Sequence, residues 1–318
     1  MSVLEVASTG MATSVQDAGR FGMQRYGLVP SGAMDRLSLA AGNALVGNAP
    51  FAAAVEVGPQ GAVFVARGAV RVAVTGAVRA VDVNGHGRRM YHSVLLDDGE
   101  RLTLGAARDG VFGYLAVEGS IAGEPIFDSL SVNARAGLGS PYPRPLRNGD
   151  RLETRTATSA AHERRLERPA ESVDPIRVVL GPQDDEFGAA CETLLDTEWR
   201  ILSSSDRMGY RLDGAKLAHA HGYNIVSDGT VDGSIQVSGN GQPIVLMKDR
   251  GTTGGYPKIA TVTTADFGRF AQMRFGRPFR FKAIDVQEAQ AQARAFRKLI
   301  DDLPGMVQDA DGMKDKTR

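Results

Sequence analysis

The chain has 318 residues, a formal net charge of zero, 42% hydrophobic residues and 23% charged residues. This length suggests about two domains of roughly 100–200 residues each, with cores of ordinary size. The balanced charge gives no electrostatic reason to expect nucleic acid or an acidic membrane surface as a partner.

Cys191 is the single cysteine, so no disulfide can form within the chain, which fits a reducing compartment. Residues 1–5 lack the basic start and long apolar core of a signal peptide. No apolar run approaches the ~20 residues that a membrane-spanning helix needs. We therefore expect a cytoplasmic protein with no membrane partner.

The first half of the chain predicts one helix followed by many short strands. The helix begins at Asp35, a suitable N-cap, and extends through about Val46, with Gly47 as its C-terminal cap. Apolar residues then recur with a period of two in segments separated by glycine-containing turns, at 62–65, 70–74, 80–83, 93–96, 101–104 and 112–117. Such spacing favours an antiparallel barrel or sandwich.

The second half resumes after a polar stretch, residues 156–175, that is nearly free of large apolar side chains. A strand starts at Ile176, further short strands follow, and helices are predicted over 183–196, 266–275 and 285–303. We predict an N-terminal β-barrel domain over 1–160, a linker over 161–175, a C-terminal β-barrel domain with a terminal helix over 176–303, and a frayed tail over 304–318.

The most informative stretch is residues 242–263. An apolar strand runs into the charged triplet 248–250, and a glycine-rich loop then leads to Lys258. Loops mounted on a rigid scaffold are where binding and catalysis concentrate. Gly254 and Gly255 allow positive φ or a close approach of the backbone to a ligand.

Other loops are also dense in glycine, aspartate and arginine, at 16–22 with 31–35, at 205–212, and at 227–229 with 239–241. An arginine fixed in a loop suits a carboxylate or phosphate, because its planar guanidinium donates two parallel hydrogen bonds. A neighbouring aspartate can orient the arginine or act as a base. The alternative is an ion pair that only ties loops together.

Lys258 and Tyr256 each allow two interpretations. Lys258 can anchor a carboxylate or carbonyl oxygen, or act as an acid if burial lowers its pKa, or it can be a solvated lysine after a turn. Tyr256 can hydrogen-bond a substrate or pack as core. The loop 251–258 is no phosphate-binding P-loop, since no Gly-Lys-Ser/Thr ends it. His219 and His221 lack an acidic or cysteine partner at a characteristic spacing, so no metal site is predicted.

Five ordered motifs carry a resemblance to a known family. They begin at Val15 (Val-Gln-Asp-Ala-Gly-Arg-Phe-Gly), Ser31 (Ser-Gly-Ala-Met-Asp), Ser205 (Ser-Asp-Arg-Met-Gly-Tyr-Arg-Leu), Gly239 (Gly-Asn-Gly-Gln-Pro-Ile-Val-Leu-Met) and Thr252 (Thr-Thr-Gly-Gly-Tyr-Pro-Lys-Ile-Ala-Thr-Val). Over about residues 1–303 the chain resembles the family called allophanate hydrolase subunit 2, KipA, or the C subunit of bacterial ATP-dependent 5-oxoprolinase. It is also similar to half of the carboxyltransferase domain of urea carboxylase.

The resemblance implies a mainly β protein with two cyclophilin-like β-barrel domains, a few short helices and a C-terminal helix. It implies a composite site shared with a KipI-like protein, also called allophanate hydrolase subunit 1, and in the oxoprolinase a third, LamB/YcsF-type protein. The implied substrate is a small molecule with an amide or ureido carbonyl, either 5-oxoproline, opened to glutamate at the expense of ATP, or an allophanate- or urea-type compound.

The cofactors follow from the same resemblance. ATP would serve the assembled complex at a site not confined to this chain, and biotin would take part if the chemistry is carboxyl transfer. The alternative is a regulatory protein that antagonises a KipI-like kinase inhibitor. The polar Gly-Asp-Arg loops favour the enzyme, because a pure interaction surface more often shows aromatic anchors in an apolar patch.

Negative charge develops on oxygen when such a carbonyl is activated, and fixed donors would stabilise it. We expect Lys258 and Arg250 to supply the positive field and Asp249 or Asp228 to orient them or accept a proton. The substrate-binding candidates are Asp17, Arg20, Arg207, Gly254, Gly255 and Tyr256, of which Arg20 and Arg207 would hold a substrate carboxylate. The family pattern Ala-Asp-Arg-Gln reads Lys-Asp-Arg-Gly here, so Lys248 adds a positive charge and Gly251 removes an amide.

Overall fold

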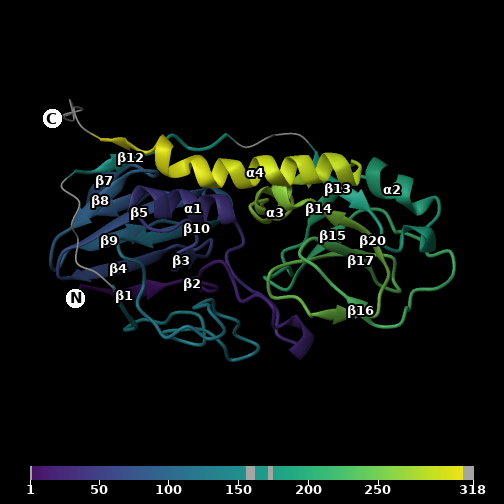
Figure 1. Cartoon of the computed structure of the whole chain (residues 1–318), viewed down its shortest axis with the longest axis horizontal. Helices are drawn as coiled ribbons and strands as arrows, with labels where there is room; N and C mark the ends of the chain where they lie inside the picture. The colour runs from purple at the N-terminus through teal and green to yellow at the C-terminus, as the bar shows by residue number, and fades with distance from the viewer. Residues whose placement is uncertain (1, 155–161, 171–174, 311–318) are drawn as a thin grey trace. The chain divides into compact units, whose positions relative to one another are not determined.

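The computed structural model describes residues 2–154, 162–170 and 175–310, which group into two compact units (Figure 1). Unit 1 comprises the residues up to Arg20, residues 31–170 and the residues from Lys298 onward, and unit 2 comprises residues 21–30 and 171–297. The division at residue 170 falls inside the range predicted as a linker. Two segments depart from the predicted domain ranges. Residues 21–30, predicted in the N-terminal domain, group with unit 2, and the residues from 298 onward group with unit 1.

Unit 1 is built on two antiparallel sheets. The first contains, in order, β11 (Arg151–Glu153), β1 (Val3–Thr9), β4 (Ala62–Arg67), β9 (Arg101–Leu104), β6 (Val81–Val83) and β7 (His86–Arg88). The second contains β2 (Ser14–Gln16), β3 (Ala54–Val57), β10 (Asp109–Val117), β5 (Val70–Val78) and β8 (Ser93–Leu96). One cluster of buried apolar side chains from both sheets forms the core, as the period-two pattern requires.

β5 departs from simple alternation, since eight of its nine residues are buried. Its second face is covered by α1 (Arg36–Leu45), which also packs against β10 (Figure 1). Thr75 of β5 donates a hydrogen bond from Oγ1 to the carbonyl of Ser38 in that helix, at 2.6 Å. The predicted cap is confirmed, because the Asp35 carboxylate accepts from the amides of Leu37 and Ser38 at 3.1 Å each.

Unit 2 is built on one eight-stranded sheet. Its strands are, in order, β21 (Pro278–Phe279), β14 (Trp199–Ile201), β15 (Gly209–Asp213), β18 (Pro243–Leu246), β17 (Ser234–Val237), β20 (Lys258–Val262), β13 (Ile176–Leu180) and β22 (Phe281–Ala283). The two edge strands, β21 and β22, are separated only by Arg280, so the edges come together and the sheet is a nearly closed barrel. The predicted mainly β class is confirmed.

The remaining elements are η1 (Gln24–Tyr26), η2 (Asp184–Glu186), α2 (Ala190–Asp196), α3 (Thr264–Ala271), α4 (Val286–Met306), β12 (Arg164–Arg165) and β23 (Gln308–Asp309). The helix predicted over 183–196 is interrupted between η2 and α2, where Gly188 has a φ of 50°. The described part of the predicted frayed tail is ordered, since α4 runs to Met306 and β23 pairs with β12. Residues 311–318 lie outside the described residues. No helix in the described part of the chain is both long enough and apolar enough to cross a membrane.

A buried ion pair ties α3 to β13. The Asp266 carboxylate is 1% exposed and accepts from Arg177 at 2.5 and 2.9 Å and from Arg269 at 2.9 Å. Burial alone would raise the pKa of Asp266, but the hydrogen bonds from the Arg177 side chain and amide, with the charge of Arg269, hold this pKa below its usual value.

Replacing Asp266 with asparagine should therefore lower the free energy of unfolding of unit 2 by about 2–4 kcal/mol at neutral pH. The folded-state pKa is depressed, so this stabilisation is present above the unfolded pKa of about 3.9 and is lost as the pH falls through the folded value. Urea midpoints of both proteins from about pH 7 to about pH 3 should converge at the acidic end. A gap that stays constant would show that the charge of Asp266 does not contribute.

Candidate functional site

The loop that follows β18 is overlaid by residues 226–232, which we call the arm. Most of its residues are exposed, but Thr230 is buried and Asp232 is partly buried. Within it, β16 (Asp228–Gly229) pairs with β19 (Thr253–Gly254) in a two-stranded sheet separate from the barrel. Thr230 extends the pairing, with its amide donating to the Thr252 carbonyl at 3.0 Å and its hydroxyl to the Gly251 carbonyl at 2.6 Å. This register places Asp228 and Asp232 of the arm beside the buried cations Lys248, Arg250 and Lys258.

Lys258 is the buried cation at the end of that loop. Its side chain is 3% exposed, and its ammonium lies 3.0 Å from the carboxylate of Asp228, which is 54% exposed. Gln183 holds the backbone of Lys258 through two hydrogen bonds. The side-chain oxygen of Gln183 accepts from the backbone amide of Lys258 at 3.0 Å, and the backbone amide of Gln183 donates to the Lys258 carbonyl at 3.1 Å. The structure thus brings together two predicted catalytic residues and excludes a solvated Lys258.

Asp228 is held as a carboxylate by this contact. The hydrogen bond from Lys258 is the main cause that lowers the pKa of Asp228, with the Gly229 amide as a second donor. A carboxylate with a depressed pKa is a weak base near neutral pH. Asp228 is therefore better suited to orient the Lys258 ammonium than to accept a proton from the substrate.

Two more buried cations share one aspartate of the arm. Lys248 Nζ lies 2.7 Å from Asp232 Oδ2, and Arg250 NH1 contacts Asp232 Oδ1. Arg250 also donates to the Thr230 carbonyl at 3.4 Å. Burial lowers the pKa of Arg250, against the opposing effect of Asp232. Lys248, the cation that departs from the family pattern, therefore contacts the same carboxylate as Arg250.

Arg207 and Asp249 form a pair of their own. Arg207 Nε and NH2 lie 2.9 and 3.2 Å from the two carboxylate oxygens of Asp249, and the Asp249 amide donates to the Arg207 carbonyl at 2.8 Å. Both side chains are largely buried. This two-point contact pairs Asp249 with Arg207, whereas the sequence predicted that Asp249 would orient Lys258 or Arg250. Because Asp249 occupies the fork of Arg207, the geometry lends no support to Arg207 as the holder of a substrate carboxylate.

The structure rules out one of the two alternatives predicted for Gly254 and Gly255, which is positive φ. Neither Gly254 nor Gly255 has a positive φ. A Cβ on Gly254 would lie 2.3 Å from Nε2 of Gln236, which donates to the Tyr256 carbonyl at 3.1 Å. The glycine at 254 therefore makes room for Gln236. The Tyr256 residue is 38% exposed, which does not fit the packed alternative.

The charged residues of the first predicted loop, Asp17, Arg20 and Asp35, lie in unit 1, where they are buried. Asp17 accepts hydrogen bonds from the Gly19 amide at 2.8 Å, the Ser129 hydroxyl at 2.7 Å, the Leu130 amide at 2.6 Å and the Ser131 hydroxyl at 2.5 Å. Arg20 is fully buried and donates to the Ser131 carbonyl. These contacts make Asp17 and Arg20 organisers of the loop at 129–131.

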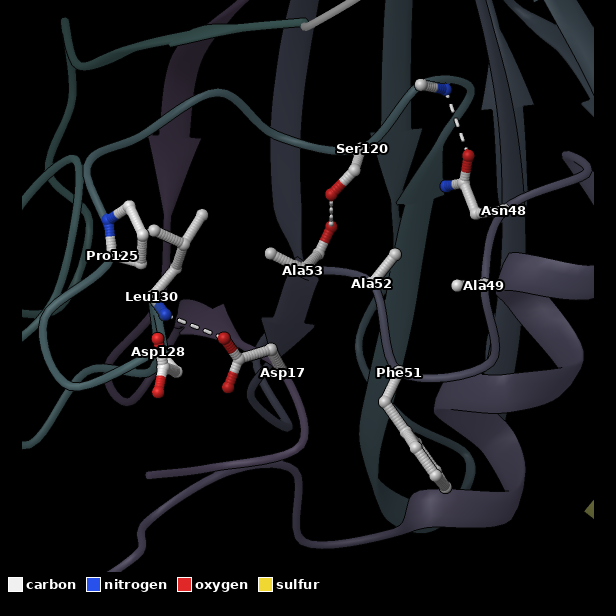
Figure 2. Close-up of a pocket in the computed structure, with 11 residues that line it drawn as sticks. Asp17, Asn48, Ala49, Phe51, Ala52, Ala53, Ser120, Pro125, Asp128 and Leu130 are labelled. Atoms are coloured by element: carbon white, nitrogen blue, oxygen red, sulfur yellow. Dashed lines mark hydrogen bonds between the residues drawn. The ribbon is translucent and has the colours of Figure 1, made fainter. Parts of the chain in front are cut away.

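Asp17 also lines a pocket of about 460 Å³, a volume within the range of small-molecule sites. Figure 2 shows it between the connection that follows α1 and the loop that follows β10. The lining residues, all in unit 1, are Asp17, Asn48, Ala49, Phe51, Ala52, Ala53, Gly119, Ser120, Pro125, Asp128 and Leu130. The dashed contacts in Figure 2 join the lining residues to one another, so the walls are fixed.

Asp232 and Gln183 are the site residues that the sequence did not reveal. Asp232 stands before Gly233, and an Asp-Gly pair is an ordinary turn signal. Its contacts reach 16 and 18 residues along the chain, to Lys248 and Arg250. Within the described part of the chain, no group of three or more His, Cys, Asp or Glu side chains could hold a metal ion.

Comparisons with known proteins agree with the architecture and the motifs. Residues 26–283 match the model of the carboxyltransferase domain, subdomains A and B. The chain belongs to this family. The resemblance inferred from the five sequence motifs is therefore confirmed.

Two bacterial relatives, both C subunits of 5-oxoprolinase, match over almost their whole length. The protein of Haemophilus influenzae is 34% identical over 96% of this chain and 99% of its own, and that of Escherichia coli is 36% identical over 93% and 97%. The crystal structure of the Kluyveromyces lactis urea amidolyase superposes with a TM-score of 0.88 at 26% identity, over 95% of this chain and 20% of the yeast chain. The same architecture thus occurs as a whole subunit and as one part of a longer chain.

Proposed function

We propose that this chain is a subunit of a heteromeric enzyme that acts on an amide carbonyl, with 5-oxoproline as substrate, ATP as energy source and glutamate as product. The near full-length match to two bacterial 5-oxoprolinase C subunits carries the proposal. The more distant urea amidolyases are named for chemistry at a ureido carbonyl, which also places charge on an oxygen.

The geometry in unit 2 supports a role in that chemistry. Lys258 is buried, held through its backbone by Gln183, and its side-chain nitrogen lies 3.0 Å from the Asp228 carboxylate. A protonated amine in a partly water-excluded place is suited to stabilise negative charge on a carbonyl oxygen. Lys258 is therefore the proposed electrostatic catalyst, with Asp228 as its orienting residue and Arg250 as a second source of positive field.

ATP is assigned to the assembled complex and not to this chain alone. The glycine-rich loop 251–255 leads into the strand β20, whereas a phosphate-binding loop of the common kind leads into a helix N-terminus. A KipI-like subunit 1 protein is the proposed partner that completes the site, and a LamB/YcsF-type protein is the proposed third subunit.

A direct assay tests this function. The purified chain, a KipI-like subunit and a LamB/YcsF-type subunit are mixed with ATP and 5-oxoproline, and glutamate and ADP are measured. We expect turnover in the complete mixture and none with any subunit left out. A complete mixture that forms a stable complex without producing glutamate would contradict the proposal.

The urea amidolyase relatives support a second candidate, carboxyl transfer to a urea-type substrate. The same subunits are then mixed with urea or allophanate and a carboxylated biotin carrier. Turnover here with none of 5-oxoproline would replace the first function by the second. Binding of the KipI-like protein without turnover in either assay would favour the regulatory alternative.

A further inference from the structure

Gln183 contacts both members of the Lys258–Asp228 pair. Its backbone amide donates to the Lys258 carbonyl at 3.1 Å, and its side-chain oxygen, Oε1, accepts from the Lys258 amide at 3.0 Å. Its side-chain nitrogen, Nε2, lies 3.3 Å from Oδ2 of Asp228, the same oxygen that Lys258 Nζ contacts at 3.0 Å. One residue thus joins the buried cation to its carboxylate.

Elementary hydrogen-bond chemistry decides which way the carboxamide of Gln183 faces. A backbone amide can only donate, so the N–H of Lys258 must meet the acceptor Oε1, and the donors on Nε2 then face Asp228. An ionised glutamate at position 183 could accept from Lys258 but could not donate to Asp228, and a methionine could do neither. The two contacts together require a primary amide.

Gln183 is anchored to the barrel, whereas Asp228 lies on the surface. Gln183 follows β13, which pairs with β20, and the Gly181 amide continues this pairing by donating to the Ile259 carbonyl at 2.9 Å. The side chain of Asp228 is 54% exposed. An exposed carboxylate paired with a lysine is weakly ordered, because water competes for it and side-chain entropy opposes the pairing. A second donor attached to the barrel restricts the orientation of Asp228.

Both oxygens of the Asp228 carboxylate have donors. Oδ1 accepts from the Gly229 amide at 2.7 Å, and Oδ2 accepts from Lys258 and Gln183. The hydrogen bond from Lys258 is the main cause that lowers the pKa of Asp228, and the hydrogen bond from Gln183 is the smallest of the lowering effects. Gln183 therefore contributes more to the orientation of Asp228 than to its charge.

We propose that Gln183 is a positioning residue, which holds the Lys258 backbone and the Asp228 carboxylate in one geometry and so aims the Lys258 ammonium. The inference rests on the proposed function, in which Lys258 stabilises negative charge on a carbonyl oxygen. Groups that are oriented before the reaction stabilise such charge best, because they need no reorganisation when it develops. Gln183 supplies this orientation without contacting the substrate.

The wild-type chain alone provides the first test. NMR spectra are recorded as the pH is lowered from about 7 over the range in which the chain stays folded. The side-chain amide signals of Gln183 should shift in parallel with the carboxyl carbon of Asp228, because protonation of Asp228 weakens the bond that Nε2 donates. The Asp228→Asn protein, which also assigns the carboxyl signal, should lack this titration. Gln183 signals that do not follow Asp228 would overturn the proposal.

Variants of Gln183 give the second test on the same chain. Gln183→Glu should raise the pKa of Asp228, because a carboxylate replaces a donor beside it. Gln183→Met should raise this pKa less, because the donor is lost without a new charge. The matched control is Gln290→Glu, which adds the same charge at an exposed position of α4 and should leave the pKa of Asp228 unchanged. An unchanged Asp228 pKa in folded Gln183→Glu would contradict the contact.

The assembled complex gives the functional readout. Gln183→Met should lower kcat for 5-oxoproline by about tenfold with little change in KM, because the aim of the ammonium and not the binding of the substrate is lost. Gln183→Glu should move the acidic limb of the kcat profile to higher pH, since Asp228 orients Lys258 as a carboxylate. A lower urea midpoint with an unmoved acidic limb would reduce Gln183 to a structural role.

Failure of this inference differs from failure of the proposed function. The NMR measurements need no other subunit, so a complete mixture that makes no glutamate would refute the function and leave the contacts of Gln183 standing. Gln183 signals that ignore Asp228, in a chain whose complex turns over 5-oxoproline, would refute the positioning role alone.

Discussion

Replacing Lys258 with methionine should lower the turnover number of the assembled complex by about 10²–10³-fold, the usual effect of removing one fixed donor to a developing oxyanion. The fold should survive, because methionine fills most of the volume of the lysine side chain. The Asp228 carboxylate left behind is 54% exposed and can be hydrated. Turnover is measured as glutamate formed per complex, with unfolding by urea followed in parallel.

The matched control is Lys282→Met, which removes an exposed lysine from β22 of the same barrel. This variant should keep wild-type turnover. If Lys258→Met retained wild-type turnover in a complex of normal composition, Lys258 would not be the electrostatic catalyst. A loss of turnover together with a lower urea midpoint would instead assign Lys258 a structural role.

Replacing Asp17 with asparagine should lower the free energy of unfolding of unit 1 by about 2–4 kcal/mol, because hydrogen bonds to charged groups contribute about 1.5–3 kcal/mol each and are not additive. The carboxylate accepts from two amides and two hydroxyls that organise the loop at 129–131. An amide group would turn NH₂ toward some of these donors. Urea unfolding followed by circular dichroism measures the change.

Asp128→Asn is the control, because Asp128 lines the same pocket and is exposed, with no hydrogen bond or ion pair among the described residues. Its effect on stability should be within about 0.5 kcal/mol. The sequence placed Asp17 in substrate binding, whereas its contacts indicate a structural role. An Asp17→Asn protein with wild-type stability and impaired substrate binding would restore the assignment made from sequence.

The sequence predicts secondary structure well where local chemistry decides it. Asp35 marks the start of α1, and period-two alternation identifies the strands of unit 1. It does not predict that β5 is buried on both faces, because α1 covers it through tertiary packing. It also predicts fraying after Pro304, where α4 continues to Met306 and a strand follows. There, pairing with a distant strand, β12, overrides the local signal.

The candidate site was predictable in part. The composition of the loop points to Lys258, Asp228 and Asp249 as residues that share a region, and the structure gives each a charged partner. The pairing pattern was not predictable, because the register of the arm against β19 decides which aspartate meets which cation. Asp232 was missed for this reason. Of the two alternatives given for the loop glycines, positive φ does not occur at Gly254 or Gly255, and a close approach to a ligand stays a prediction. The side chain of Gln236 lies beside Gly254.

The closure of the barrel in unit 2 has a consequence for biosynthesis. β13 is the first strand of that barrel, and its outer edge is covered by β22, which forms a parallel pair with it about a hundred residues later in the chain. During synthesis the N-terminal part of the chain emerges from the ribosome first. The backbone N–H and C=O groups on the outer edge of β13 therefore stay unpaired until residues 281–283 have emerged. An exposed strand edge invites pairing with other chains. A polypeptide that stops before β21 would thus carry two open edges, on β14 and on β13. The short segment 278–283, which covers both edges, is what separates a closed barrel from an aggregation-prone fragment.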